Sequence, residues 1–377
     1  MKRISIVVLI LCAGFVSVAW GQQPACKFSP FWAEFHKQEM VRWNRCENVL
    51  NVSNVGNLVL KWSFTTINHN YVFSSPAVAN GAVYVGAGDD NVYALNASTG
   101  AKLWSYSTFG TVDSSPAVNG AVFVGGYDSY VYALNAKTGG KLWRFGASDI
   151  VESSPTVTNG VVYVGSGGNV NNNNLYALSA STGAKLWSFP IGTAGTVLSS
   201  PAVANGVVYI GSGKLYALNA STGAKLWSRA VGGEFSSPAV TNGVVYSGGF
   251  NVNALDAKTG HKLWSYTTGN QVVSSPAVAS GTVYVGSGSS VYALNAKTGH
   301  KLWSFTTGGL VFSSPAVANG VVYVGSEDNN IYALDASTGA KLWSFTTGNR
   351  VDSSPAVSNG MVYVGSLDGN LYAFGLK

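Results

Sequence analysis

The sequence is poor in the side chains that carry most enzymatic and metal chemistry. Only 10% of its 377 residues are charged, and its four histidines, His36, His69, His261 and His300, lack the spacing typical of metal ligands. His261 and His300 fall in a turn position that related segments fill with alanine or glycine, which indicates solvated turn residues. No basic run is long enough to indicate nucleic-acid binding, although the formal net charge is +6. We therefore expect no metal site and no nucleic-acid partner.

Helical patterns are missing as well. No part of the repeated region described below contains a ten-residue stretch with apolar residues at helical spacing. The chain instead has 46% hydrophobic residues, 12% aromatic residues and 46 glycines, enough to bury a large core between many tight turns. This composition excludes a disordered or collagen-like chain.

The N-terminus carries a pattern typical of export. Residues 1–21 combine two basic residues, an apolar run from Ile4 to Ala19 and a small residue at the end, which predicts a cleavable signal peptide. A membrane span is the alternative, but the run is short for the roughly 20 residues that a spanning helix needs. Cys12 lies inside the apolar run after a leucine, so lipid attachment is not expected. We expect an exported protein, periplasmic or secreted, with no membrane span in the mature chain.

Cysteine is scarce, with three in the chain. Cys12 would leave with the signal peptide, so Cys26 and Cys46 would remain in an oxidising compartment with one possible pairing. We predict a Cys26–Cys46 disulfide within a leader of residues 22–58. Two unpaired buried thiols are the alternative.

The main signal is an internal repeat built around the tripeptide Ser-Ser-Pro. Its copies lie about 40 residues apart, a period typical of propellers and solenoids. The prolines of the eight copies are Pro76, Pro116, Pro155, Pro201, Pro238, Pro276, Pro315 and Pro355.

Each repeat reads as four short strands, named A to D in chain order. Runs such as "SSPAV", "GVVYVGS", "VYALNA" and "KLWSFTT" are rich in valine and aromatic residues and are separated by Asn-Gly or Ser-Thr-Gly turns. A proline inside a central strand would remove a ladder hydrogen bond, so strand A must be an edge. Its small serine and alanine neighbours suit the crowded centre of a ring, which places strand A at the channel and strand D at the rim.

The first and last repeats are incomplete in complementary ways. The eighth repeat ends at "LYAFGLK" without a tryptophan strand, whereas "LVLKWSF" near the start has no strands A to C before it. We predict that residues 59–65, with Trp62, supply strand D of the last blade. The fold class is therefore all-β: residues 59–377 form an eight-bladed propeller closed by an N-terminal strand, which removes open sheet edges.

The string "ALNASTGAKLW", residues 94–104, recurs with fixed spacing between its alanine, glycine and tryptophan. This resembles the tryptophan-docking motif of quinoprotein alcohol dehydrogenases and related PQQ-like eight-bladed propellers. The resemblance implies that each tryptophan packs on the neighbouring blade and has a structural role. Besides Trp62, the tryptophans concerned are Trp104, Trp143, Trp187, Trp227, Trp264, Trp303 and Trp343.

The leader also resembles that of the quinoprotein dehydrogenases, through Arg42, Asn54, Val55, Leu58 and Trp62. Their catalytic parts have no counterpart here. In that family PQQ lies over a calcium ion held by Glu, Asn and Asp and is often capped by a disulfide between adjacent cysteines, but this sequence has no Cys-Cys pair and no haem-attachment motif. The chain is more similar to the non-enzymatic, BamB-like branch of the family, so we predict no cofactor, with PQQ and calcium as the alternative.

Variation between repeats indicates where function lies. The A-B and C-D turns barely change, whereas the D-A and B-C connections change in every blade and should lie on one face. Most acids fall there, together with aromatic residues just before the Ser-Ser-Pro copies. The candidate binding residues are Tyr71, Phe73, Asp89, Asp90, Asp113, Asp128, Glu152, Glu234, Phe235, Phe312, Glu327, Asp328, Arg350, Asp352 and Asp368.

These observations favour a binding or scaffolding module with a protein or peptide ligand, such as a cell-envelope protein, on this acidic face. The simpler alternative is that loops collect solvated charge. A small PQQ-dependent dehydrogenase that oxidises alcohols or sugars is the enzymatic alternative.

Overall fold

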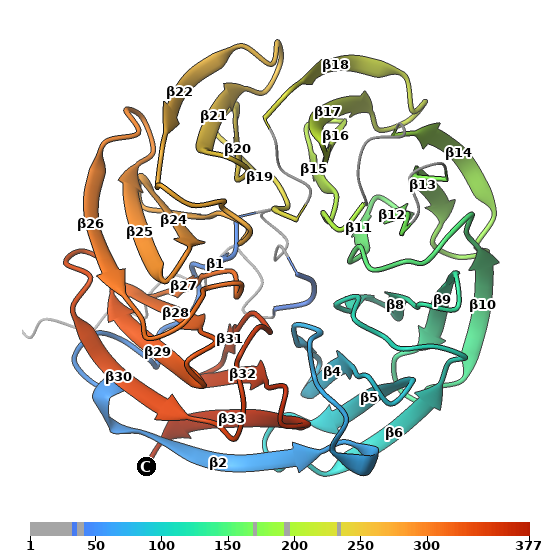
Figure 1. The fold of residues 1–377 in the computed structure, drawn as a ribbon. Helices are drawn as coiled ribbons and strands as arrows, with labels where there is room; N and C mark the ends of the chain where they lie inside the picture. The colour runs from blue at the N-terminus through green and yellow to red at the C-terminus, as the bar shows by residue number, and fades with distance from the viewer. Residues whose placement is uncertain (1–31, 36–40, 169–171, 192–196, 232–234) are drawn as a thin grey trace, which may run out of the picture.

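The computed structural model describes residues 32–35, 41–168, 172–191, 197–231 and 235–377. The predicted signal peptide and Cys26 lie outside these residues. Eight blades, each of four antiparallel strands, stand around a central channel (Figure 1), and β1 (Trp43–Asn44) adds a fifth strand to the sheet of blade 7. The predicted eight-bladed propeller is confirmed. Helix is limited, in the described part of the chain, to two short 3-10 turns, η1 (Val55–Asn57) and η2 (Ile67–His69), and no described helix is long and apolar enough to cross a membrane.

Each blade follows the predicted order A to D from the channel outward. Blades 1 to 4 consist of β3 (Ala77–Ala79), β4 (Ala82–Gly86), β5 (Asn91–Asn96), β6 (Lys102–Ser107); β7 (Ala117–Asn119), β8 (Ala121–Gly125), β9 (Tyr130–Asn135), β10 (Lys141–Gly146); β11 (Thr156–Thr158), β12 (Val161–Ser166), β13 (Asn174–Ser179), β14 (Lys185–Pro190); and β15 (Ala202–Ala204), β16 (Val207–Ser212), β17 (Lys214–Asn219), β18 (Lys225–Arg229). Blades 5 to 8 consist of β19 (Ala239–Thr241), β20 (Val244–Ser247), β21 (Val252–Asp256), β22 (Lys262–Tyr266); β23 (Ala277–Ala279), β24 (Thr282–Ser287), β25 (Ser290–Asn295), β26 (Lys301–Thr306); β27 (Ala316–Ala318), β28 (Val321–Gly325), β29 (Asn330–Asp335), β30 (Lys341–Thr346); and β31 (Ala356–Ser358), β32 (Met361–Gly365), β33 (Asn370–Leu376), β2 (Leu58–Thr65).

The short A strands line the channel, as the proline argument predicted. Each lies beside the A strand of the next blade, for example β3 beside β7 and β31. Proline immediately precedes strand A, so it takes no donor position in the three-residue ladder with strand B. Buried valines and alanines of strands A, B and C fill the space between blades.

The ring is closed by strands from opposite ends of the chain. β2 pairs antiparallel with β33, from Leu58 opposite Leu376 to Thr65 opposite Asn370. In Figure 1 the blue β2 runs along the outer edge of the red β33. The predicted closure by residues 59–65 is confirmed, with the strand starting one residue earlier.

The tryptophans form the predicted contacts between blades. Trp104 donates its indole N–H to the Ala136 carbonyl oxygen of the next blade at 3.0 Å. Its ring lies against Gly139, where a Cβ atom would come within 2.7 Å of the indole, so this turn needs glycine both for space and for its φ of +73°. The hydrogen bond and the glycine contact recur at six other blade interfaces. At the eighth interface Trp343 donates to Leu58, where the chain enters blade 8, and meets none of the described glycines.

The leader packs against the A strands instead of forming a blade of its own. β1 (Trp43–Asn44) pairs in parallel with β27, and the Val78 and Val118 N–H groups donate to carbonyl oxygens of Trp32 and Ala33. Cys46 is disulfide-bonded, while its predicted partner Cys26 lies outside the described residues.

Candidate functional site

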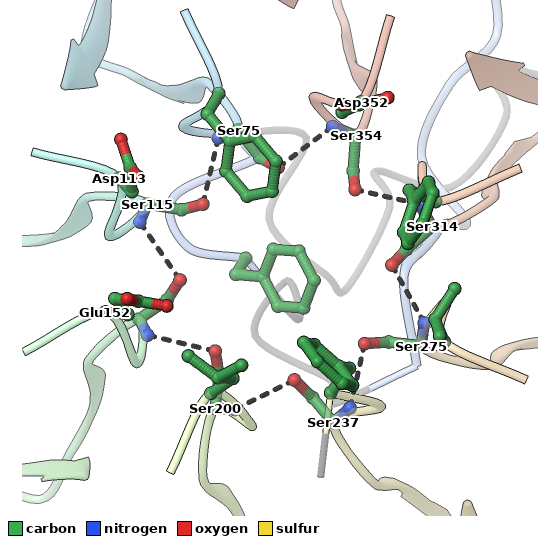
Figure 2. A pocket seen from close by; sticks show the side chains of 17 residues that line it. Ser75, Asp113, Ser115, Glu152, Ser200, Ser237, Ser275, Ser314, Asp352 and Ser354 are labelled. Carbon is green, nitrogen blue, oxygen red and sulfur yellow. Dashed lines mark hydrogen bonds between the residues drawn. The ribbon is translucent and has the colours of Figure 1, made fainter. Parts of the chain in front are cut away.

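The second serine of each Ser-Ser-Pro copy belongs to a closed ring of hydrogen bonds around the channel. The backbone N–H of Ser75 donates to Oγ of Ser115 in the next blade, and the pattern continues until Ser354 donates to Oγ of Ser75. The donor to acceptor distances are 2.8 to 3.0 Å. Figure 2 shows most of this ring from along the channel. The repeated tripeptide is therefore explained by the joining of blades.

The residue before each serine pair forms a second ring, here called the mouth ring. Its members, in blade order, are Phe73, Asp113, Glu152, Leu198, Phe235, Val273, Phe312 and Asp352. Together with the serine ring and Phe35 they line a cavity of about 170 Å³, here called the cup. Three acids occupy blades 8, 2 and 3, whereas blades 4 to 7 present only apolar side chains.

The leader supplies Phe35 to this cavity. The fully buried guanidinium of Arg42 donates to the Phe35 carbonyl oxygen at 2.5 Å and to the Pro315 and Pro355 carbonyl oxygens at 2.9 and 3.1 Å. It also lies 4.6 Å from the centre of the Phe35 ring. Burial lowers the pKa of Arg42 to about 9. Arg42, which the leader resemblance singled out, thus anchors Phe35 through backbone carbonyls.

Asp113 and Glu152 form one acidic part of the mouth ring. Burial, followed by the neighbouring Glu152 charge, raises the pKa of Asp113 to about 6 against a hydrogen bond from Tyr127. Burial also raises the pKa of Glu152, whose carboxylate accepts a hydrogen bond from the Tyr127 hydroxyl. Oδ1 of Asp113 is buried and has no hydrogen-bond partner within the described residues. The pair can therefore accept a cation or hydrogen-bond donors from a ligand.

Asp352 forms the other acidic part. Its side chain is 6% exposed, and its Oδ2 lies 3.6 Å from Nε of Arg350, which also binds Glu327 at 2.9 Å. Burial raises the pKa of Asp352 to about 6, partly offset by Arg350, while Glu327 adds to the rise. Its Oδ1 has no hydrogen-bond partner in the described parts of the chain. Three of the candidate residues are thus brought together here.

Four of the candidate acids have their carboxylates occupied by the protein. Asp328 accepts hydrogen bonds from the Tyr332 hydroxyl and the Gly308 N–H, both at 2.6 Å, so it joins its B-C loop to the preceding D-A loop. Burial raises its pKa, but these hydrogen bonds and those from Asn330 outweigh burial and leave the pKa below its ordinary value. The equivalent positions in other blades, with the same two kinds of donor, are Asp89, Asp128 and Asp368.

The remaining candidate residues lie around the cup, in a neighbouring loop, or outside the residues that the structure describes. Phe73, Phe235 and Phe312 expose 43%, 45% and 37% of their surface, which leaves apolar area for a partner. Tyr71 adjoins Asp113, whose charge contributes to its raised pKa after burial, the largest cause. Asp90 uses its backbone carbonyl oxygen to accept from Thr108, and Glu234 lies outside the described residues.

Sequence reasoning missed Phe35 and the serine ring, which line the cup, and Tyr127, which donates to Glu152 of the mouth ring. Phe35 belongs to the unrepeated leader, so no comparison between repeats could place it. Tyr127 occupies a variable B-C loop beside Asp128 and was a detectable aromatic signal. The eight serine pairs were visible, but their mutual hydrogen bonds join residues about 40 positions apart and depend on the ring geometry.

The charges that line the cup bear on PQQ with calcium, the alternative cofactor. PQQ carries three carboxylates, and the cup presents three carboxylates of its own with Arg350 already engaged by Glu327 and Asp352. Among the described residues, no group of three or more His, Cys, Asp or Glu side chains is placed to hold a metal ion. The cavity is also smaller than the 300 Å³ or more typical of ligand pockets of this kind.

Comparisons with known proteins agree with this architecture. The sequence pattern of the family described as outer membrane protein assembly factor BamB matches residues 61–170, 110–234, 171–306 and 287–377. No curated protein matches the chain.

Solved structures with the same fold include enzymes and non-enzymes. Europium-containing methanol dehydrogenase is similar at 18% identity over 92% of this chain and 98% of that chain, with a TM-score of 0.81. BamB from Moraxella catarrhalis is similar at 20% identity over 85% of this chain and 100% of that chain, with a TM-score of 0.72. Quinohemoprotein alcohol dehydrogenase from Comamonas testosteroni is similar at 17% identity over 92% and 80% of the two chains, with a TM-score of 0.76. At these identities the likeness shows the fold alone.

Proposed function

Because this chain belongs to the family of the outer membrane protein assembly factor BamB, we propose that it is an exported protein-binding or scaffolding module that holds a partner segment at its mouth ring. The observation that carries this proposal is the division of the mouth ring into acidic and apolar parts. A segment with a basic side chain beside apolar ones complements both parts.

The buried carboxylates support this choice of partner. Asp113 and Asp352 each keep one buried oxygen without a hydrogen-bond partner in the described chain, a state that costs free energy until a ligand donor satisfies it. Phe235 and Phe312 then offer exposed apolar surface whose burial adds to binding.

Periplasmic or secreted localisation follows from the predicted signal peptide and forms part of this proposal. The proposal disfavours PQQ-dependent dehydrogenation, because the carboxylates of the mouth ring would repel those of PQQ. The direct check is calorimetric titration with PQQ and calcium followed by dye-linked oxidation of alcohols and sugars, and turnover would reverse the choice.

The binding proposal is tested by capturing partners from a cell-envelope extract with the wild type and with a triple variant, Asp113→Asn, Glu152→Gln and Asp352→Asn. We expect the triple variant to lose the proteins that the wild type retains, because neutral side chains no longer attract a basic segment.

The matched control changes two acids of the opposite C-D turns, Asp256→Asn and Asp335→Asn. Asn96 and Asn295 fill the same turn position in other blades, so the control preserves the fold. The control should retain the partners. Equal retention by the triple variant would remove the acidic part of the mouth ring from consideration.

A further inference from the structure

An aromatic pair joins neighbouring blades near the rim. The residue two positions after the D-strand tryptophan contacts the strand C tyrosine of the next blade, with ring centres 5.0 to 6.2 Å apart at seven interfaces. Phe189 and Tyr216, at 5.9 Å, form the pair between blades 3 and 4. Tyr266 and Tyr292, at 6.2 Å, form it between blades 5 and 6.

The interface between blades 4 and 5 breaks this rule at both positions. Arg229 replaces the aromatic residue of strand D, and Asn253 replaces the tyrosine of strand C. This interface therefore lacks both aromatic rings, which are present at the other seven interfaces.

A pocket of about 620 Å³ lies at this interface. Its volume falls within the range of about 300 to 1,000 Å³ typical of small-molecule sites. The buried Leu255 contributes an apolar wall, and Phe250, which is 73% exposed, lines the same pocket. The missing rings have thus left a space with apolar boundaries.

The pocket is also cationic. Arg229, His261 and Lys262 line it, and its described lining contains no acid. Nε of Arg229 donates to the Gly260 carbonyl oxygen at 2.9 Å, which orients the guanidinium. Within the described residues the two terminal nitrogens of Arg229 have no partner, so their paired N–H groups can bind a carboxylate in two places at once.

The Asn253 side chain is held in position as well. It is 6% exposed, its Nδ2 donates to the Asn251 carbonyl oxygen at 3.2 Å, and its Oδ1 accepts from Ser265 at 3.1 Å. A polar residue at this strand position is therefore accommodated by its own partners.

From these observations we propose that the pocket between β18 and β21 binds a small planar aromatic anion, with Arg229 as the carboxylate ligand and the ring in the space of the missing aromatic pair. The site lies at the rim and is independent of the function proposed for the mouth ring.

The test is isothermal titration calorimetry of the full chain with indole-3-carboxylate and benzoate, with indole as the uncharged probe and acetate as the probe without a ring. We expect saturable one-to-one binding of at least one aromatic carboxylate, and weaker binding of indole and acetate. Arg229→Met should weaken binding by about tenfold or more, because it removes a charged bidentate contact.

Two further variants make the test specific. Lys225→Met removes one charge from the same strand outside the pocket and should leave binding unchanged. The double variant Arg229→Phe with Asn253→Tyr restores the pair of the other seven interfaces and should abolish binding. Absence of saturable binding by the wild type, unchanged binding by Arg229→Met, or equal losses in Arg229→Met and Lys225→Met would overturn the proposal. If the double variant does not fold, the Arg229→Met and Lys225→Met pair decides.

Discussion

At the rim, the eight blades present tryptophan eight times, whereas in the mouth ring the same blades present five different residue types. Seven of the eight rim tryptophans lie against a glycine of the next blade, so their identity is set by packing. The mouth-ring side chains instead line the cup. The repeated residues therefore hold the blades together, and the positions that vary between blades are available for recognition.

The largest expected loss of stability is that of Trp264→Ala at the rim. Trp264 is 9% exposed and donates to the Ala296 carbonyl oxygen at 2.9 Å. Loss of the indole leaves a cavity against Gly299, so we expect the free energy of unfolding to fall by about 3 to 5 kcal/mol in chemical denaturation. The adjacent Leu263, 53% exposed, provides the control, and Leu263→Ala should change stability by less than about 0.5 kcal/mol. Equal effects at the two positions would reject the docking role.

The next effect concerns the serine ring. Ser275→Ala removes the Oγ that accepts the Ser237 N–H at 2.9 Å, and both residues are buried. Because a buried N–H then lacks an acceptor, we expect a loss of about 1 to 3 kcal/mol in the free energy of unfolding. Ser98→Ala, in an exposed turn, is the comparison variant and should be neutral. A neutral Ser275→Ala would mean that the ring adds nothing to stability.

A smaller effect is expected in the mouth ring, where the free energy of unfolding should depend on pH. Burial raises the pKa of Asp113 and of Asp352 to about 6, above the value of about 3.9 for an unfolded chain. The folded state then binds more protons between about pH 4 and 6, so stability contributed by these groups falls as pH rises through that window. In the variant Asp352→Asn, the free energy of unfolding should decrease less between pH 4 and pH 7 than in the wild type. Urea unfolding curves recorded across this pH range measure it. Superimposable pH profiles of variant and wild type would contradict the burial of this carboxylate.

The smallest expected change in stability is that of Phe235→Ser in the mouth ring. Phe235 is 45% exposed, so its loss should alter the free energy of unfolding by less than about 0.5 kcal/mol. The same variant should weaken retention of the envelope partners captured by the wild type, because it removes apolar contact area. A large loss of stability with unchanged retention would invert the proposed roles of rim and mouth.

Much of the fold could be predicted because the chain contains eight copies of one sequence repeat. The proline of each copy placed strand A at the channel, and Trp62 without its own blade predicted the β2–β33 closure. The candidate site was less predictable, since Asp328 and Asp352 both appear in the sequence as acids of variable connections. One is hydrogen-bonded by its neighbouring loop and the other keeps a buried oxygen without a partner in the described chain, a difference created by loop geometry. Phe35 reaches the cup from an unrepeated leader, which periodicity cannot address.

The β2–β33 pairing also sets the order of assembly. Strands β31 to β33 pair with one another, but the outer strand of their sheet comes from residues 58–65 at the other end of the domain. The ring can therefore be closed only after residues 370–376 have emerged from the ribosome. Until then β2 lacks the strand that it pairs with in the finished ring, and a partner that shields the edge of β2 would act on the timing of ring closure.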